Sequence, residues 1–214
     1  MSTTRLFLIR HGETRANREF RYIGARDDAL NETGTRQAAQ LATALAVLPI
    51  TTIYSSPLQR AIATATPIAA ALQLEIQIAP ELRENDFGAW EGLSRAEVLA
   101  QGEEEQRLLR AWEHDSTLAP PGGESFATLQ QRVRTYVEQL AQRHAGQTIA
   151  LVSHVGPIKA LLATALDMPV SAALRIFLDP ATISVIDWHA DNHGLIRLVN
   201  SHAHLGWTLA RWMQ

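Results

Sequence analysis

The sequence contains no cysteine. This absence excludes disulfides, a thiolate nucleophile and cysteine-ligated zinc or iron–sulfur centres. Lysine is scarce as well: Lys159 stands alone against eighteen arginines, and the net charge is −3. This charge balance does not favour a nucleic-acid surface or a polybasic membrane anchor. No apolar run approaches the roughly 20 residues that span a bilayer, so we expect a cytoplasmic protein with no nucleic-acid or membrane partner.

Several common motifs are also missing. The chain has no Gly-x-x-x-x-Gly-Lys loop, no Gly-x-Gly-x-x-Gly fingerprint, no Gly-x-Ser-x-Gly elbow and no His-Glu-x-x-His pair. These patterns mark P-loop nucleotide sites, dinucleotide sites, serine hydrolases and zinc proteases. The chemistry of this chain must therefore be carried by other residues.

Hydrophobic residues make up 46% of the 214 residues, enough for a sizeable core. Apolar segments predict strands over 3–9, 51–56, 74–79 and 148–154, followed by an antiparallel pair over 182–189 and 194–201. Helical patterns cover 31–47, a segment from 57 with a kink or interruption at Pro67, and 94–112, 125–145 and 157–166.

This alternation predicts a three-layer α/β/α sandwich with a mostly parallel sheet and an antiparallel edge. We expect one domain over residues 1–214. The segment over about 83–125 is much longer than a crossover needs. We therefore expect it to form a helical flap over one sheet edge.

Polar residues follow four of the predicted strands. Arg10 and His11 end the first, Arg60 lies one turn into the helix after the second, Glu84 follows the third, and His154 follows a later strand. The carboxyl ends of parallel strands meet in one crevice of an open α/β sheet. We therefore expect these five side chains to converge.

Their chemistry suits phosphoryl transfer. Guanidinium groups grip phosphate through paired hydrogen bonds, and with a protonated histidine they could cradle a dianion. A neutral imidazole is a competent nucleophile near pH 7. An enclosed glutamic acid with a raised pKa could protonate the leaving alkoxide.

Six segments carry a resemblance to a known family. They are LIRHGET, FRYIGARDDALNETG, SSPLQRAIATA, ELRENDFGAWEGL, PPGGES and LVSHVGPIKALL, in that order. With them the chain resembles the histidine phosphatase superfamily, in the phosphoglycerate mutase-like branch that includes α-ribazole-phosphate phosphatases. The resemblance runs from about Arg5 to Ser201 and implies the phosphoglycerate mutase-like fold.

The resemblance also implies residue roles. His11 would be the nucleophile that becomes phosphohistidine, Glu84 the proton donor, and Arg10, Arg60 and His154 the groups that hold the phosphoryl oxygens. The implied substrate-binding residues are Arg10, Asn17, Ile23, Gly24, Arg60, His154 and Val155. Many relatives have glycine where this chain has Val155, which affects the substrate fit. No metal and no cofactor is implied.

Alternatives remain open at this point. The segment from Glu84 to Gly92 is similar to the phosphatase subgroup rather than to mutases, whose acid is usually followed by a pattern like RHYG. A phosphoglycerate mutase dependent on 2,3-bisphosphoglycerate is the alternative, and an inactive phospho-ligand-binding relative is a remote one. A small phosphomonoester is the expected partner, and a homodimer stays open.

Three further features have competing interpretations. His189, His193, His202 and His204 could suggest a metal site, but no carboxylate stands at ligand spacing with both pairs. Trp90 could line the entrance of the site. Four arginines, namely Arg15, Arg18, Arg21 and Arg26, could face the entrance and suit a second anionic group, or belong to a solvated loop.

Overall fold

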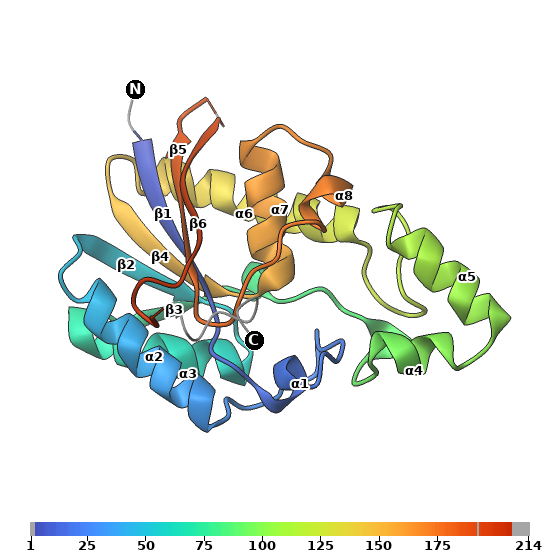
Figure 1. Cartoon of the computed structure of the whole chain (residues 1–214). Coiled ribbons are helices and arrows are strands. Elements are labelled where there is room, and N and C mark those ends of the chain that lie inside the picture. The colour runs from blue at the N-terminus through green and yellow to red at the C-terminus, as the bar shows by residue number, and fades with distance from the viewer. Residues whose placement is uncertain (1–2, 192, 207–214) are drawn as a thin grey trace.

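Six strands form one mixed sheet at the centre of the computed structural model, which describes residues 3–191 and 193–206 (Figure 1). The order is β3-β2-β4-β1-β5-β6, with β1 to β4 parallel and β5 and β6 antiparallel at one edge. The strands are β1 Thr3–Arg10, β2 Ile50–Ser55, β3 Ile76–Ile78, β4 Thr148–Ser153, β5 Ile183–His189 and β6 Gly194–Ser201. The predicted fold class is confirmed.

Helices cover both faces of the sheet (Figure 1). They are α1 Arg15–Arg18, α2 Glu32–Leu45, α3 Gln59–Leu72, α4 Arg95–Leu99, α5 Glu103–Trp112, α6 Phe126–Arg143, α7 Val155–Ala165 and α8 Val170–Ala173. Helices α2 and α3 pack on one face, and α6 and α7 on the other. No helix among the described residues is long and apolar enough to cross a membrane.

The central strands are apolar on both sides because both of their faces are covered. In β1, Leu6 and Leu8 contribute to the core under α6 and α7, whereas Ile9 contributes to the core under α2 and α3. Side chains alternate in direction along a strand, so one short segment supplies both layers. Strands β1 and β2 both pair with β4 in parallel, so the carboxyl ends of the three strands lie at one edge of the sheet.

The segment expected as a flap carries a small core of its own. Helices α4 and α5 extend beyond the main body on one side of the molecule (Figure 1). The chain folds them as two helices rather than the single one predicted, because Gly102 interrupts the segment with φ +149°. Trp90 is completely buried here with Val98 and Leu109, so the idea that Trp90 lines the entrance is wrong.

Two other local expectations differ from the structure. Helix α3 is not interrupted at Pro67. Proline has no N–H to donate to the carbonyl oxygen of Ala63, but Ala63 is exposed and this oxygen can bind water instead. Ala65 and Ile68 on the other side of the helix pack in the core. The short helices α1 and α8 were not predicted, since four residues are too few for a helical pattern. Helix α1 begins with a capping box between Thr14 and Asn17.

Candidate active site

The carboxyl ends of β1 and β4 bring two histidines together. The backbone N–H of His11, directly after β1, donates to the carbonyl of Ser153 at the end of β4, 3.0 Å away. His154 is the next residue, and the centroids of the two imidazole rings are 5.0 Å apart. The predicted convergence at this edge of the sheet is what the structure shows for both histidines.

The orientation of His11 is fixed by its own neighbour. Its Nδ1 lies 2.7 Å from the carbonyl oxygen of Gly12, so Nδ1 carries the proton and Nε2 keeps a lone pair. The N–H of Gly12 in turn donates to Thr64 Oγ1 at 2.9 Å. A Cβ at position 12 would lie 2.6 Å from the carbonyl oxygen of Gly34, which explains why glycine is needed.

The imidazole of His11 is uncharged in this environment. Burial lowers its pKa well below the usual value, and the charges of Arg60 and Arg10 lower it further. Its side chain is almost fully enclosed, with the whole residue 3% exposed. A neutral, oriented imidazole beside two guanidinium groups is a nucleophile placed where an anionic substrate would be held.

Arg60 lies fully buried beneath the site and is held by three acceptors. Its guanidinium donates to the carbonyl oxygen of Arg26 at 2.8 Å and that of Gly24 at 2.9 Å, and its Nε donates to His154 Nδ1 at 3.2 Å. Gly24 thus contributes a backbone carbonyl that positions Arg60.

His154 is neutral, contrary to the protonated histidine that the sequence suggested. Its Nδ1 accepts from Arg60, and its Nε2 lies 2.8 Å from Ser56 Oγ. Burial lowers the pKa of His154 well below the usual value, and Arg60 and His11 lower it further. The positive charge of the site therefore comes from the guanidinium groups.

Arg10 and Asn17 belong to the same site. Arg10 ends β1 and donates to the carbonyl oxygen of Leu178. Asn17 accepts from the backbone N–H of Thr14 at 3.1 Å, so the capping box of α1 holds its amide in place. Both side chains line the inner cavity described below.

Glu84 is an enclosed carboxyl group. Its Oε1 accepts from the backbone N–H of Asn85 and from that of Gly156, both at 2.9 Å. Burial is the main influence and raises its pKa, against the opposing effect of these two hydrogen bonds and of Arg60 and Arg10. The group therefore retains a proton to higher pH than an ordinary glutamate, as a general acid requires.

Gly156 is a site residue that sequence reasoning did not single out. A Cβ there would lie 2.3 Å from Glu84 Oε1, so only glycine allows the carboxyl group to approach the start of α7. The neighbouring Val155 lines the inner cavity, but the close approach of the Glu84 carboxyl group is at position 156.

An inner cavity of about 210 Å³ adjoins these groups. Ile23 and Val155, both predicted as substrate-binding residues, are in its lining. The full lining is Arg10, Asn17, Arg21, Tyr22, Ile23, Glu84, Asn85, Phe87, Trp112, Phe126, Val155, Gly156, Lys159 and Leu174. Apart from the polar groups at its catalytic end, the wall is largely aromatic and aliphatic.

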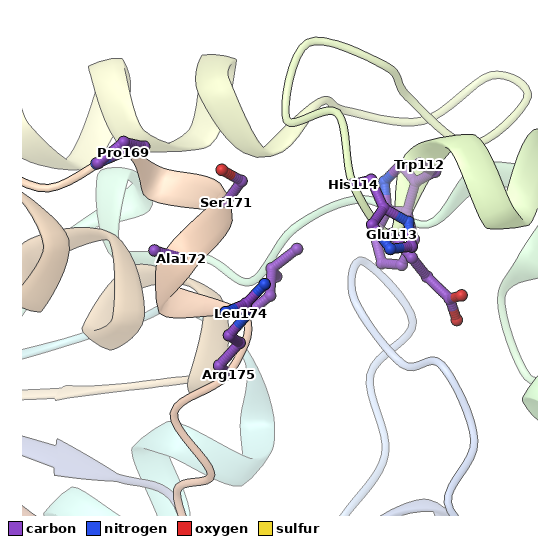
Figure 2. A pocket seen from close by; sticks show the side chains of 8 residues that line it. All are labelled: Trp112, Glu113, His114, Pro169, Ser171, Ala172, Leu174 and Arg175. Atoms are coloured by element: carbon purple, nitrogen blue, oxygen red, sulfur yellow. The ribbon is translucent and has the colours of Figure 1, made fainter.

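A wider cavity of about 610 Å³ lies outside the inner one and shares Trp112 and Leu174 with it. Figure 2 shows Trp112, the last residue of α5, with Glu113 and His114 after it, facing α8 and the turn that carries Arg175. The wider cavity therefore adjoins the inner one between the end of the flap and α8.

Comparison with known proteins gives the family. The model of the histidine phosphatase superfamily, branch 1, matches residues 6–201. The chain belongs to this superfamily. The predicted membership is confirmed, and named relatives in this superfamily are phosphatases.

Named relatives of this superfamily member include a bifunctional protein of Mycobacterium tuberculosis, 43% identical over 203 residues. That alignment covers 94% of this chain but 55% of the relative, so the chain spans about half the length of this curated relative. Phosphoserine phosphatase 1 of Hydrogenobacter thermophilus is 36% identical over 203 residues, with 94% of each protein covered. The solved mycobacterial glucosyl-3-phosphoglycerate phosphatase in complex with VO3 has a TM-score of 0.84 and 31% identity, covering 92% of this chain and 99% of that one.

The four arginines of the segment after β1 contact acidic groups. The pairs are Arg15 with Glu19 at 2.5 Å, Arg18 with Glu13 at 2.8 Å, Arg21 with Glu97 at 2.7 Å, and Arg26 with Asp28 at 3.6 Å. Of the four, Arg21 lines the inner cavity. Their charges are thus largely committed to neighbours of opposite sign.

The histidines near the C-terminus make other contacts. His202 Nε2 lies 2.7 Å from Asp179 in a buried pair, His204 Nε2 lies 2.8 Å from the carbonyl oxygen of Ala181, and His189 Nδ1 lies 3.0 Å from Thr3 Oγ1. Among the residues that the structure describes, no group of three or more histidine, aspartate or glutamate side chains could hold a metal ion.

Proposed function

We propose that this chain is a metal-independent phosphatase that hydrolyses small phosphorylated metabolites through a phosphohistidine intermediate on His11. The observation that carries the proposal is the orientation of His11, whose neutral ring has Nδ1 bound to the Gly12 carbonyl and Nε2 available. The named phosphatases among its relatives support the same activity.

The first step transfers the phosphoryl group. His11 Nε2 attacks phosphorus while the bond between phosphorus and the ester oxygen breaks. Arg10 and Arg60 stabilise the charge on the phosphoryl oxygens, because a fixed guanidinium fork fits them without reorganisation. The leaving alkoxide takes the proton that burial keeps on Glu84.

The second step restores the enzyme. The carboxylate of Glu84 accepts a proton from water as the oxygen of that water attacks the phosphohistidine. The bond between Nε2 and phosphorus breaks, phosphate leaves, and His11 returns to its neutral form. His154 accepts from Arg60 and its ring lies against that of His11, so it positions the Arg60 guanidinium and shapes the phosphate pocket.

The activity test is phosphate release in the presence of EDTA. The panel comprises p-nitrophenyl phosphate, 3-phosphoglycerate, phosphosugars and α-ribazole phosphate. We expect His11→Ala to abolish release, whereas His193→Ala, at an 83% exposed side chain, serves as a matched control and should retain it. More than a few per cent of activity in His11→Ala would contradict the phosphohistidine mechanism.

The same assay separates the alternatives. Conversion of 3-phosphoglycerate to its 2-isomer after priming with bisphosphoglycerate, without phosphate release, would identify a mutase. Binding of phosphorylated ligands with neither release nor isomerisation would identify an inactive relative. The cytoplasmic location, the oligomeric state and the absence of nucleic-acid or membrane partners stay predictions.

A further inference from the structure

The inner cavity contains a cation that the proposed chemistry does not use. Lys159, the chain's single lysine, lies one helical turn after Val155, and both line the cavity from α7. Its Nζ donates to the carbonyl oxygen of Leu174 at 3.4 Å, a long contact. No carboxylate among the described residues comes within ion-pair distance of this ammonium group.

The surroundings of the Lys159 charge differ from those of Arg21, another cation in the cavity lining. Arg21 donates to Glu19 at 2.8 Å and to Glu97 at 2.7 Å. Burial lowers the pKa of Lys159 to about 8, the positive charge of Arg10 adds to this effect, and Glu84 opposes it in part. Near pH 7 the amine is still mostly protonated, so the cavity holds an ammonium group that forms no ion pair with any described carboxylate.

Two further polar atoms in the same wall lack partners. Asn85 Oδ1 and Trp112 Nε1 are buried and have no hydrogen-bond partner among the described residues. The Asn85 amide nitrogen donates to the carbonyl oxygen of Glu124 at 3.0 Å, which leaves Oδ1 as the open acceptor. Both atoms are closed off from solvent, so they belong to the interior of the wall and are not contact points for a ligand in the cavity.

The size of the cavity limits the ligand. Its volume of about 210 Å³ is below the usual range for drug-sized ligands, which starts at about 300 Å³. The cavity thus holds the ammonium of Lys159 in the same lining as Arg10 and Glu84, with little room between apolar walls.

We propose that Lys159 is a specificity-determining residue that binds a second anionic group of the substrate, a carboxylate in a small phosphomonoester. This inference rests on the proposed function. The carboxylate would contact the Lys159 ammonium in the cavity that Lys159 lines together with Arg10 and Glu84. Lys159 touches the non-reacting part of the substrate and takes no part in proton transfer.

The test compares ligands that differ only in the carboxylate. 3-Phosphoglycerate and glycerol 3-phosphate share the phosphate and the secondary hydroxyl, and the second has a hydroxymethyl group in place of the carboxylate. O-Phosphoserine and O-phosphoethanolamine form a second pair. We expect the protein to favour the carboxylate in each pair by about tenfold or more in kcat/KM, as a charge-assisted contact predicts.

Three variants decide the role of Lys159. Lys159→Met keeps the length of the side chain and removes the charge; it should abolish the preference, lowering kcat/KM for 3-phosphoglycerate about tenfold and changing that for glycerol 3-phosphate less than about twofold. Lys159→Arg should retain part of the preference. Arg107→Met removes a positive charge from the exposed surface of α5 and should leave the preference unchanged.

Failure of this inference is distinguishable from failure of the proposed function. Hydrolysis of p-nitrophenyl phosphate by the unchanged protein tests the function alone. Calorimetric binding of 3-phosphoglycerate and glycerol 3-phosphate to His11→Ala protein, with and without Lys159→Met, tests the inference without turnover. Equal binding of both ligands, or an equal loss of both on Lys159→Met, would overturn the role of Lys159 even in an active phosphatase.

Discussion

Substitution of Gly156 by alanine should remove the general acid without touching the nucleophile. The new Cβ would lie 2.3 Å from Glu84 Oε1, whereas an ordinary contact at this position needs 3.4–4 Å. Because the contact atom lies at the end of the flexible Glu84 side chain, we expect that side chain to move rather than the helix. The carboxyl group must therefore move by about 1 Å and lose the hydrogen bond from the Gly156 N–H.

The magnitude follows from this displacement. A misplacement of about 1 Å can cost roughly a hundredfold in rate, which lies within the range of about 10² to 10⁴ that a general acid contributes. We expect kcat/KM for alkyl phosphates to fall about a hundredfold. p-Nitrophenyl phosphate should lose less than about threefold, because a nitrophenolate leaves without a proton. Stability should change little, since alanine favours a helix over glycine by roughly 1 kcal/mol and offsets the tighter packing against Leu129.

A double-mutant cycle identifies the cause. The assay is phosphate release from one alkyl and one aryl phosphate by Gly156→Ala, Glu84→Ala and the double variant. With Glu84 shortened, the Cβ at position 156 meets no carboxyl group, so the second substitution should add almost no loss. Equal losses on both substrates, or losses that multiply in the double variant, would refute the reasoning.

Two further predictions concern proton binding. Glu84→Gln should slow the hydrolysis of alkyl phosphates far more than that of aryl phosphates. The same substitution should stabilise the fold at neutral pH. Because the pKa of Glu84 is raised in the folded protein, the contribution of Glu84 to stability is lost as pH rises through that pKa, and glutamine does not titrate. Equal losses on both substrates would remove Glu84 from the acid role. His11 and His154 are buried and neutral with lowered pKa values, so the free energy of unfolding should fall as pH drops below about 6.5, by up to roughly 1.4 kcal/mol per pH unit for each histidine. Urea titrations at a series of pH values give the free energy of unfolding as a function of pH. This free energy should fall less steeply with decreasing pH in His11→Gln and as steeply as in the unchanged protein in His193→Ala. An equally steep fall in His11→Gln would contradict the assignment.

The sequence predicts the position of a site residue best where that residue directly follows an apolar strand. His11 and His154 could be placed at one edge because the strands before them are apolar and parallel, and Arg60 because a helix start follows β2. Their roles stay predictions, but the structure brings these side chains together. Gly102 and Pro67 were less predictable, since their effect depends on packing around them.

The rest of the site depends on contacts between distant segments. Glu84 and Gly156 are 72 residues apart, and nothing in either local pattern signals that a carboxyl oxygen will lie against the start of α7. Leu174 reaches the inner cavity from the segment after the unpredicted helix α8. Among the arginines after β1, Arg21 pairs with Glu97, 76 residues away, and no local pattern in the sequence signals that pair.

The most direct measurement of the central claim is the capture of a phosphoryl group on His11. The protein is mixed briefly with p-nitrophenyl phosphate, quenched at alkaline pH where phosphohistidine survives, and examined by intact mass and peptide mapping. The account predicts one added phosphoryl group on the peptide that contains His11, and none in His11→Ala. Rapid turnover with no phosphorylated His11 at any quench time, or phosphorylation that persists in His11→Ala, would contradict it.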